Sequence, residues 1–243
     1  MSAIETQALT RRFGELTAVD ALNLTVKQGE LFALLGVNGA GKTTLIRMLC
    51  GLLAPTSGDA LVCGHSVVRE TARVKSVIGV SPQETAVGPF LTVRENLLLM
   101  AGLHGLSRAE SRERAQEMLR RLHLDTVADK RAKTLSGGWM RRVSIAMALI
   151  SEPKVLFLDE PTLGLDVLIR RELWQLIREL HTRSTVVLTT HYLEEAEALS
   201  DRVGVMQHGR LVALGTPKEL MEQAGAATFE DAFVSLAGEV SGV

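Results

Sequence analysis

The sequence is poor in features that would place the chain outside the cell or within a membrane. Its two cysteines, Cys50 and Cys63, are too few for a disulfide framework, and cysteines so far apart usually pack as small apolar side chains. No run approaches the ~18 apolar residues of a membrane-spanning helix, and the longest run, Ile145–Ile150, belongs to an expected helix. The N-terminus lacks a basic stretch followed by an apolar core, so we expect no signal peptide. These absences predict a soluble protein in a reducing compartment.

A strong charge of either sign is also missing. The 243 residues carry a formal net charge of −1, whereas proteins that bind nucleic acid usually present a basic face. We therefore expect no nucleic-acid partner. Hydrophobic residues make up 46% of the chain, which is ample for a buried core. The length fits one larger domain or two tightly joined ones.

Short apolar runs predict a mainly parallel β-sheet. Strands are expected at Leu31–Leu35, Val155–Asp159 and Thr185–Thr190, and the apolar runs within them, such as residues 155–158 and 185–188, are typical of strands covered by helices on both faces. A terminal hairpin is expected around His208-Gly209, which lie between two further apolar stretches. Other strands are expected at Leu22–Val26, Ala60–Cys63, Val77–Val80 and Val203–Gln207.

Residues 91–150 have a different pattern, with helix signals and no convincing strand. Capping boxes begin at Thr92 and Ser107, and apolar residues recur at helical spacing through the charged stretch that follows Ser107. Later in the chain, Thr216 is followed by Pro217, a common residue at the first helical position, and a final helix is expected from Thr228 to Leu236.

We interpret residues 1–243 as a single α/β domain in three parts. The core is expected over about 1–90 and 151–215, an inserted helical subdomain over about 91–150, and a C-terminal helical tail over about 216–243.

Residues 36–43 read G-V-N-G-A-G-K-T and lie between an apolar run and a helix-like run. This is the strand–loop–helix setting of a phosphate-binding loop. The glycines let backbone N–H groups turn inward around an anion, Lys42 adds a positive charge, and the helix start adds its positive end. A glycine-rich turn with a solvated lysine is the plainer alternative for this segment.

Polar residues follow several of the predicted strands, at the edge where α/β sheets bind ligands. Asp159 is placed to bind Mg²⁺ together with the Thr43 hydroxyl, and Glu160 is placed to orient a water for attack on a terminal phosphate. His191 comes within reach of that phosphate if its strand neighbours the strand before Asp159. The side chain of Gln83 could reach the metal or the attacking water. Taken alone, His191 and Gln83 would also fit ordinary surface positions.

Residues 135–138, Leu-Ser-Gly-Gly, resemble the signature motif of ATP-binding-cassette (ABC) ATPases. The motifs occur in the order that the family has, and the resemblance covers about residues 4–215. That order is the phosphate loop, Gln83, the signature, Asp159-Glu160, Leu165-Asp166 and His191.

This resemblance implies an α/β fold with a P-loop NTPase core, a mainly parallel sheet, N-terminal antiparallel β elements and an inserted helical subdomain. It also implies an ATPase that uses ATP and Mg²⁺. Phe13 occupies the place of the aromatic residue that stacks on adenine. The residues that match the phosphate-wrapping segment are Asn38, Gly39, Ala40, Gly41, Lys42, Thr43 and Thr44.

The resemblance also assigns catalytic and interface roles. Thr43, Gln83 and Asp159 match the magnesium-site residues. Glu160 matches the general base, and His191 matches the histidine that contacts the terminal phosphate; Lys42 and Gln83 complete the catalytic set. Ser136, Gly137, Gly138 and Asp166 match positions that face the nucleotide of a second subunit.

The sequence departs from the family pattern at three positions. Trp139 stands where glutamine is usual, Leu163 replaces a small or polar residue, and Val167 replaces a frequent proline. These changes affect the interface loop and the signature. Because they remove no group needed for phosphate chemistry, we expect an active ATPase.

The family resemblance further implies partners and a location. We expect a homodimer of ABC subunits at the cytoplasmic face of the cell membrane, bound to a separate multispan permease through about Glu84–Leu103. Residues 192–197 and 228–233 resemble bacterial exporters of drugs and similar compounds. Two alternatives remain: a soluble ABC clamp on ribosomes or DNA, and a phosphate-loop kinase. The kinase would leave Ser136–Gly138 and His191 without a role.

Overall fold

The computed structural model describes residues 1–181 and 184–238. In this part of the chain the strands are β1 (Ser2–Phe13), β2 (Leu16–Leu22), β3 (Thr25–Lys27), β4 (Leu31–Leu35), β5 (Ser57–Val62), β6 (His65–Ser66), β7 (Ile78–Ser81), β8 (Val155–Asp159), β9 (Thr185–Thr190), β10 (Arg202–Gln207) and β11 (Arg210–Gly215).

The helices of the same part are α1 (Lys42–Leu49), α2 (Thr71–Val77), α3 (Val93–Leu103), α4 (Arg108–Arg121), α5 (Gly137–Leu149), α6 (Val167–His181), α7 (Leu193–Leu199), α8 (Pro217–Ala224) and α9 (Phe229–Gly238), with short 3-10 turns η1 (Asp125–Val127) and η2 (Ala132–Thr134). None of these helices has the length and apolar character needed to cross a membrane.

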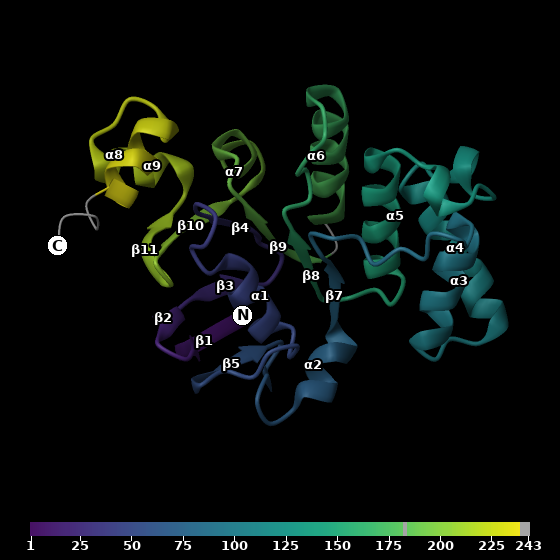
Figure 1. Cartoon of the computed structure of the whole chain (residues 1–243), viewed down its shortest axis with the longest axis horizontal. Helices are drawn as coiled ribbons and strands as arrows, with labels where there is room; N and C mark the ends of the chain where they lie inside the picture. Colours follow the sequence, from purple (N-terminus) through teal and green to yellow (C-terminus); the bar gives the residue numbers. More distant parts are fainter. Residues whose placement is uncertain (182–183, 239–243) are drawn as a thin grey trace.

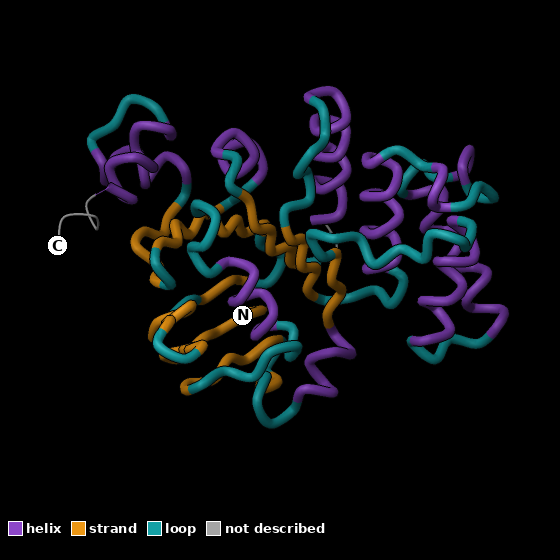
Figure 2. The backbone as a smooth tube through the Cα atoms, in the orientation of Figure 1, coloured by secondary structure: helices purple, strands orange, loops and turns teal. Residues whose placement is uncertain are grey.

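The larger sheet has the strand order β11-β10-β4-β9-β8-β7, with the strands labelled in Figure 1 and drawn in orange in Figure 2. Its strands are parallel from β10 to β7, and β11 is antiparallel to β10. Every residue of β4, β8 and β9 is buried. Successive side chains of β4 point to opposite faces, since Leu31 and Ala33 belong to one core cluster and Phe32 and Leu34 to the other. The predicted parallel sheet is confirmed, and these three strands have the predicted bounds.

The second sheet is antiparallel, with the order β2-β1-β5-β6 and with β3 also paired to β1. The expected strand over 22–26 is wrong, because β2 ends at Leu22 and β3 begins at Thr25. The two strands pair with different parts of β1. At the break between them, the side-chain oxygen of Asn23 accepts a hydrogen bond from the Ala8 N–H at 2.8 Å.

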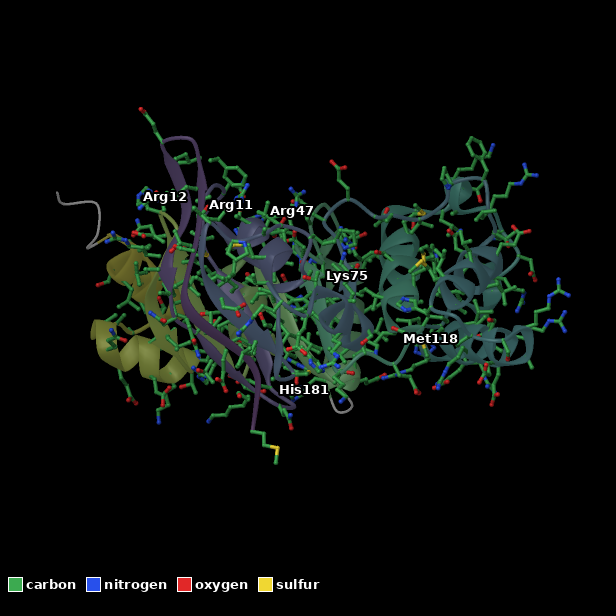
Figure 3. The ribbon with its side chains drawn as sticks, turned by 90° about the horizontal axis from the view of Figure 1, so that it is seen from below. Arg11, Arg12, Arg47, Lys75, Met118 and His181 are labelled. Carbon is green, nitrogen blue, oxygen red and sulfur yellow. The ribbon has the colours of Figure 1, made fainter. Side chains whose placement is uncertain are left out.

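The helices α3, α4 and α5, with η1 and η2, gather at one end of the molecule; we call them the helical block (Figure 1). Met118 of α4 is buried among these helices (Figure 3). The helix α5 joins the block to the larger sheet by packing against β7 and β8. Reciprocal capping boxes are present at Thr92 and Ser107, as predicted. A third is present at Thr216, where the sequence predicted a helix start with Pro217.

At the other end of the molecule, α8 and α9 pack together beside β10 and β11 (Figure 1). The helix α9 begins at Phe229, one residue later than expected. The predicted terminal hairpin is present as β10 and β11, with a turn at His208-Gly209. Both cysteines are free thiols: Cys50 is buried and Cys63 is partly buried.

Candidate functional site

A pocket of about 650 Å³ lies at the carboxyl edge of the larger sheet. The phosphate loop follows β4, Gln83 follows β7, Glu160 follows β8 and His191 follows β9, and all of them line the pocket. Four neighbouring parallel strands therefore deliver their polar residues to one place, as open α/β sheets do at their ligand sites.

The phosphate loop wraps tightly into the start of α1. Gly41 has a φ of 104°, and a Cβ at this position would lie 2.2 Å from the carbonyl oxygen of Ala18. A larger residue is therefore excluded by both backbone conformation and space. The loop is also held from outside, because the Ala40 carbonyl accepts a hydrogen bond from the Gly209 N–H at 3.0 Å. Residues Asn38, Gly39, Ala40, Gly41, Lys42, Thr43 and Thr44 all line the pocket.

The side chain of Lys42 is folded into the base of this loop. It is 6% exposed, and its ammonium donates to the Gly36 carbonyl at 2.7 Å. The ammonium also lies 3.4 Å from a carboxylate oxygen of Glu160. A positive charge is thus held in a buried position beside the backbone N–H groups of the loop.

Glu160 joins Lys42 to His191. Its second carboxylate oxygen accepts a hydrogen bond from His191 Nδ1 at 2.8 Å. The Glu160 backbone has a φ of 50°, which is unusual for a residue with a side chain. This conformation is held by its N–H group, which bonds the Thr189 carbonyl at 3.1 Å and the Thr189 hydroxyl at 3.0 Å. The backbone of β9 therefore sets the direction in which the Glu160 carboxylate points.

Thr43 and Asp159 offer oxygen ligands next to the loop. The Thr43 hydroxyl lies 3.3 Å from an Asp159 carboxylate oxygen, which also accepts a hydrogen bond from the Thr189 hydroxyl. Within the described residues, no cluster of three or more His, Cys, Asp or Glu side chains surrounds a possible metal. One carboxylate and one hydroxyl fit Mg²⁺, which takes few protein ligands and completes its shell with water and phosphate oxygens.

Phe13, the last residue of β1, also lines the pocket. Its side chain is 46% exposed, and the Arg11 guanidinium lies over its ring at 4.5 Å. The sequence analysis missed several neighbours that also line the pocket: Leu16, Thr17, Ala18, His208 and Gly209. The hairpin at His208-Gly209 was predicted, but no sequence signal places it against the phosphate loop.

Ser136–Gly138, which we call the signature turn, does not line this pocket. Ser136 and Gly137 are exposed at the start of α5, and the Ser136 side chain makes no capping hydrogen bond there. Gly138 is buried, and a Cβ at this position would lie 2.6 Å from a methyl carbon of Ile169 in α6. The single chain thus keeps the signature turn apart from its own pocket, and contact with a second subunit's nucleotide stays a prediction.

Asp166 also lies outside the pocket. One of its carboxylate oxygens accepts hydrogen bonds from the Leu168 N–H at 3.0 Å and the Ile169 N–H at 3.1 Å. The side chain therefore caps the start of α6, in the same region where α6 contacts the signature turn.

The three departures from the family pattern have clear settings. Trp139 is partly buried, and the Arg142 guanidinium lies 5.4 Å from its ring centre. Leu163 lines the pocket, and Val167 is exposed as the first residue of α6. None of the three occupies the position of the Lys42, Glu160 or His191 side chains.

Two buried polar side chains behind the pocket were missed by the sequence analysis. Glu195 of α7 is fully buried, and its carboxylate accepts a hydrogen bond from the Trp174 indole at 3.0 Å. Burial raises the pKa of Glu195 from its ordinary value. Arg141 of α5 is 6% exposed, and burial lowers the pKa of its guanidinium. Neither lies in a recognisable motif, so the sequence carried no signal for them.

The family model described as "ABC transporter" matches residues 19–163, which is more than half of the chain. A model described as "AAA domain, putative AbiEii toxin, Type IV TA system" matches residues 139–195. The chain is 45% identical to the daunorubicin/doxorubicin resistance ATP-binding protein DrrA of Streptomyces peucetius, over 92% of this chain and 68% of the relative. It is 43% identical to the Nod factor export ATP-binding protein I of Paraburkholderia xenovorans, over 90% of this chain and 73% of the relative.

Solved structures agree with these relatives. An ATP-binding subunit of an ABC transporter superposes with a TM-score of 0.86 at 29% identity, over 97% of this chain and 99% of the other. A dimeric ATP-binding cassette bound to ADP and Pi superposes with a TM-score of 0.80 at 28% identity, over 88% and 98% of the two chains. The ribosome or DNA clamp is not favoured by these matches. The chain belongs to the ABC transporter family and is an ATP-binding, ATP-hydrolysing subunit of such a transporter.

Proposed function

We propose that this ATPase drives the export of drugs or other small lipophilic compounds. The proposal is supported by the names of its relatives, which are a daunorubicin/doxorubicin resistance protein and a Nod factor export protein. The observation that carries the chemistry is the contact of Lys42, Glu160 and His191 in one pocket beside the phosphate loop.

In this proposal ATP lies along the pocket with adenine against Phe13 and the phosphates in the loop 38–44. Lys42 exchanges its bond with the Gly36 carbonyl for the outer phosphates, which carry the opposite charge. The N-terminal end of α1 adds its partial positive charge to the same site. Base stacking on an aromatic ring contributes about 1–3 kcal/mol and selects weakly among bases.

Mg²⁺ would be held by Thr43 and Asp159, with the side chain of Gln83 as a third protein ligand. The first two already lie 3.3 Å apart, and Gln83 lines the same pocket. When bound, the ion would neutralise charge on the phosphate oxygens. The Thr189 hydroxyl, which donates to Asp159, orients the carboxylate for this role.

Glu160 would act as the general base that orients the attacking water and accepts its proton. It is 5% exposed, so the water would be held in a poorly solvated setting. His191 donates its Nδ1 hydrogen to Glu160 and leaves Nε2 for a contact with the terminal phosphate. The hydrogen bond between the two side chains thus fixes the position of the general base, Glu160, relative to the His191 nitrogen that would contact the phosphate.

The active unit would be a homodimer. The signature turn of each chain would close on the terminal phosphate held by the other, and Asp166 would lie in the loop that crosses the interface. Exposure of Ser136, Gly137 and Asp166 supports this arrangement, because these residues remain open to a partner.

A separate multispan permease would bind the helical block at the cytoplasmic face of the membrane, through about residues 84–103. Phe90 and Leu103 are each 72% exposed and Leu99 is 50% exposed, so this segment offers large apolar side chains that a partner could cover. The helical subdomain of about 91–150 would transmit closure of the dimer to this partner.

The test is the substitution Glu160→Gln. We expect ATP hydrolysis to fall by about 10²–10⁴-fold, the range for loss of a general base, while ATP binding persists. The variant should accumulate as a dimer with ATP, measured by size-exclusion chromatography with and without nucleotide. The control is Glu194→Gln, an exposed position on α7 that should leave turnover unchanged. Normal turnover in Glu160→Gln would contradict the proposed role.

A further inference from the structure

Arg141 is a buried cation that does not pair with an acid. Its guanidinium donates to the Pro82 carbonyl at 2.7 Å and to the Gln83 carbonyl at 2.9 Å. The residue is 6% exposed, and across residues 1–181 and 184–238 it takes part in no ion pair. Two successive carbonyl groups of the backbone are thus gripped by one planar side chain.

A purely structural role explains this arrangement poorly. Burial of a charge is costly unless its donors are satisfied, and a carboxylate is the usual partner for a buried arginine. Burial lowers the pKa of Arg141, while Asp159, Glu195 and Glu160 act in the opposite direction. Guanidinium groups nevertheless stay protonated in proteins, so the two carbonyls interact with a full positive charge.

The two carbonyl groups belong to the segment that leads from β7 to the nucleotide pocket. Pro82 and Gln83 directly follow β7, and the Gln83 side chain lines the nucleotide pocket. Arg141 belongs to α5, whose first residues form the signature turn. The bonds from Arg141 therefore join the helix that carries the signature turn to the residue proposed to reach the metal and the attacking water.

We propose that Arg141 is a positioning residue for ATP hydrolysis, which holds the backbone of Gln83 so that its side chain reaches the phosphate end of the pocket. The fork of the guanidinium matches two adjacent acceptors, which a single ammonium or amide does not. Movement of the start of α5 would consequently shift Gln83. The proposal rests on the role given above to Gln83.

The test is a double-mutant cycle on ATP hydrolysis with Arg141→Gln, Gln83→Ala and the combined variant. We expect Arg141→Gln to lower kcat by about tenfold with an unchanged KM for ATP, because the shorter amide has one nitrogen in place of the two guanidinium nitrogens that bind the two carbonyl groups. If Arg141 acts through Gln83, the combined variant has the kcat of Gln83→Ala alone. A structural role instead predicts that the two losses multiply, and that result would overturn the proposal.

Arg142→Gln is the matched control on the same helix. Arg142 forms an ion pair with Glu172 at 2.6 Å, and Glu172 is 55% exposed, so we expect less than about twofold change in kcat. If Arg141→Gln does not fold, Arg141→Lys, which keeps the charge, replaces it in the double-mutant cycle. Thermal unfolding shows whether each of the two variants is folded. Full kcat in Arg141→Gln also overturns the proposal. Full kcat in Gln83→Ala instead contradicts the role proposed for Gln83 itself.

Discussion

Two helix starts of this chain have opposite surroundings. The start of α1 lies in a pocket that brings together the phosphate loop, Glu160 and His191 from separate strands. The start of α5 is the signature turn, where Ser136 and Gly137 are exposed and the Ser136 side chain leaves the helix uncapped. By contrast, α3, α4 and α8 each begin with a complete capping box.

This difference shows that one chain contains a helix start that lies in a pocket suited to phosphate and a second helix start that lies outside that pocket. Free N–H groups at a helix start attract anions whether or not the ligand belongs to the same chain. In α1 those groups face the pocket of their own chain. In α5 they lie outside the pocket of their own chain, and the proposed dimer would bring them to the nucleotide held by the partner. The dimeric cassette among the similar structures fits this division.

The largest expected effect comes from disabling the phosphate loop in one variant and the signature turn in another. Lys42→Ala removes the buried charge from the pocket, and Ser136→Glu places a negative charge on the signature turn. Each variant alone should lose about 10²–10³-fold in ATP hydrolysis, as when a key electrostatic donor is removed. In an equal mixture, half of the dimers carry one intact site made from both chains, and activity should return to about a quarter of wild type.

The mixture is measured by phosphate release after joint refolding or coexpression, with dimer formation checked by crosslinking. Ser107→Glu is the control, because Ser107 is also exposed at the start of a helix in the helical block but has no role in the proposed site. Mixed dimers without recovered activity would show that Lys42 and Ser136 do not act on the same nucleotide.

A smaller effect is expected at Phe13, where a substitution should weaken ATP binding without acting on closure of the dimer. Phe13→Ala removes the ring proposed to stack on the base, so KM for ATP should rise about 5- to 150-fold, equivalent to the stacking energy of about 1–3 kcal/mol. Phe13→Trp keeps a stacking face and should stay near wild type. Equilibrium binding of a fluorescent ATP analogue checks both variants. An unchanged affinity in Phe13→Ala would place adenine elsewhere.

The smallest effect concerns Glu195, which links α7 to Trp174 of α6 behind the site. Burial, with Glu160 acting in the same direction, raises its pKa above the ordinary 4.5. The folded chain then holds a proton that the unfolded chain has lost, so the free energy of unfolding falls as pH rises above 4.5. Glu195→Gln has no such proton, and it should lose less stability than wild type between pH 5 and pH 8.

This difference should amount to about 1.4 kcal/mol for each unit by which folding raises the pKa of Glu195. Urea unfolding followed by tryptophan fluorescence at the two pH values measures it. Glu197→Gln, at an exposed position of the same helix, should keep the pH dependence of the wild type. Identical pH dependence in Glu195→Gln and wild type would mean that the buried carboxyl is ionised throughout.

Sequence reasoning worked best where structure depends on nearby residues. The strands β4, β8 and β9 were predicted with their bounds, because strands buried on both faces are apolar throughout. The capping boxes at Thr92 and Ser107 were also predicted, since each needs only two side chains three residues apart. At Thr216 the helix start was predicted from Pro217, and the structure adds a capping box there.

Prediction from the sequence failed where the pairing between strands, and not the local pattern of residues, determines the structure. The family resemblance implied N-terminal antiparallel β elements, but no strand was predicted over Ser2–Phe13, the span of β1. The pairing of β1 changes partner and register along its length. Ala8, with a φ of 44°, bends the strand in its middle. Exposed and buried residues consequently do not alternate regularly, and no single face is visible in the sequence.

The amino-acid sequence by itself determined the phosphate loop, the acids after β8, the helix caps and the layered α/β architecture, because each depends on residue types at short spacing. Only the tertiary structure decided that Glu160 contacts both Lys42 and His191, that Arg141 binds the backbone at Gln83, and that the signature turn lies outside the pocket of its own chain. Such contacts join segments far apart in the chain. Strand order and packing set their distances, and neither is contained in any local pattern.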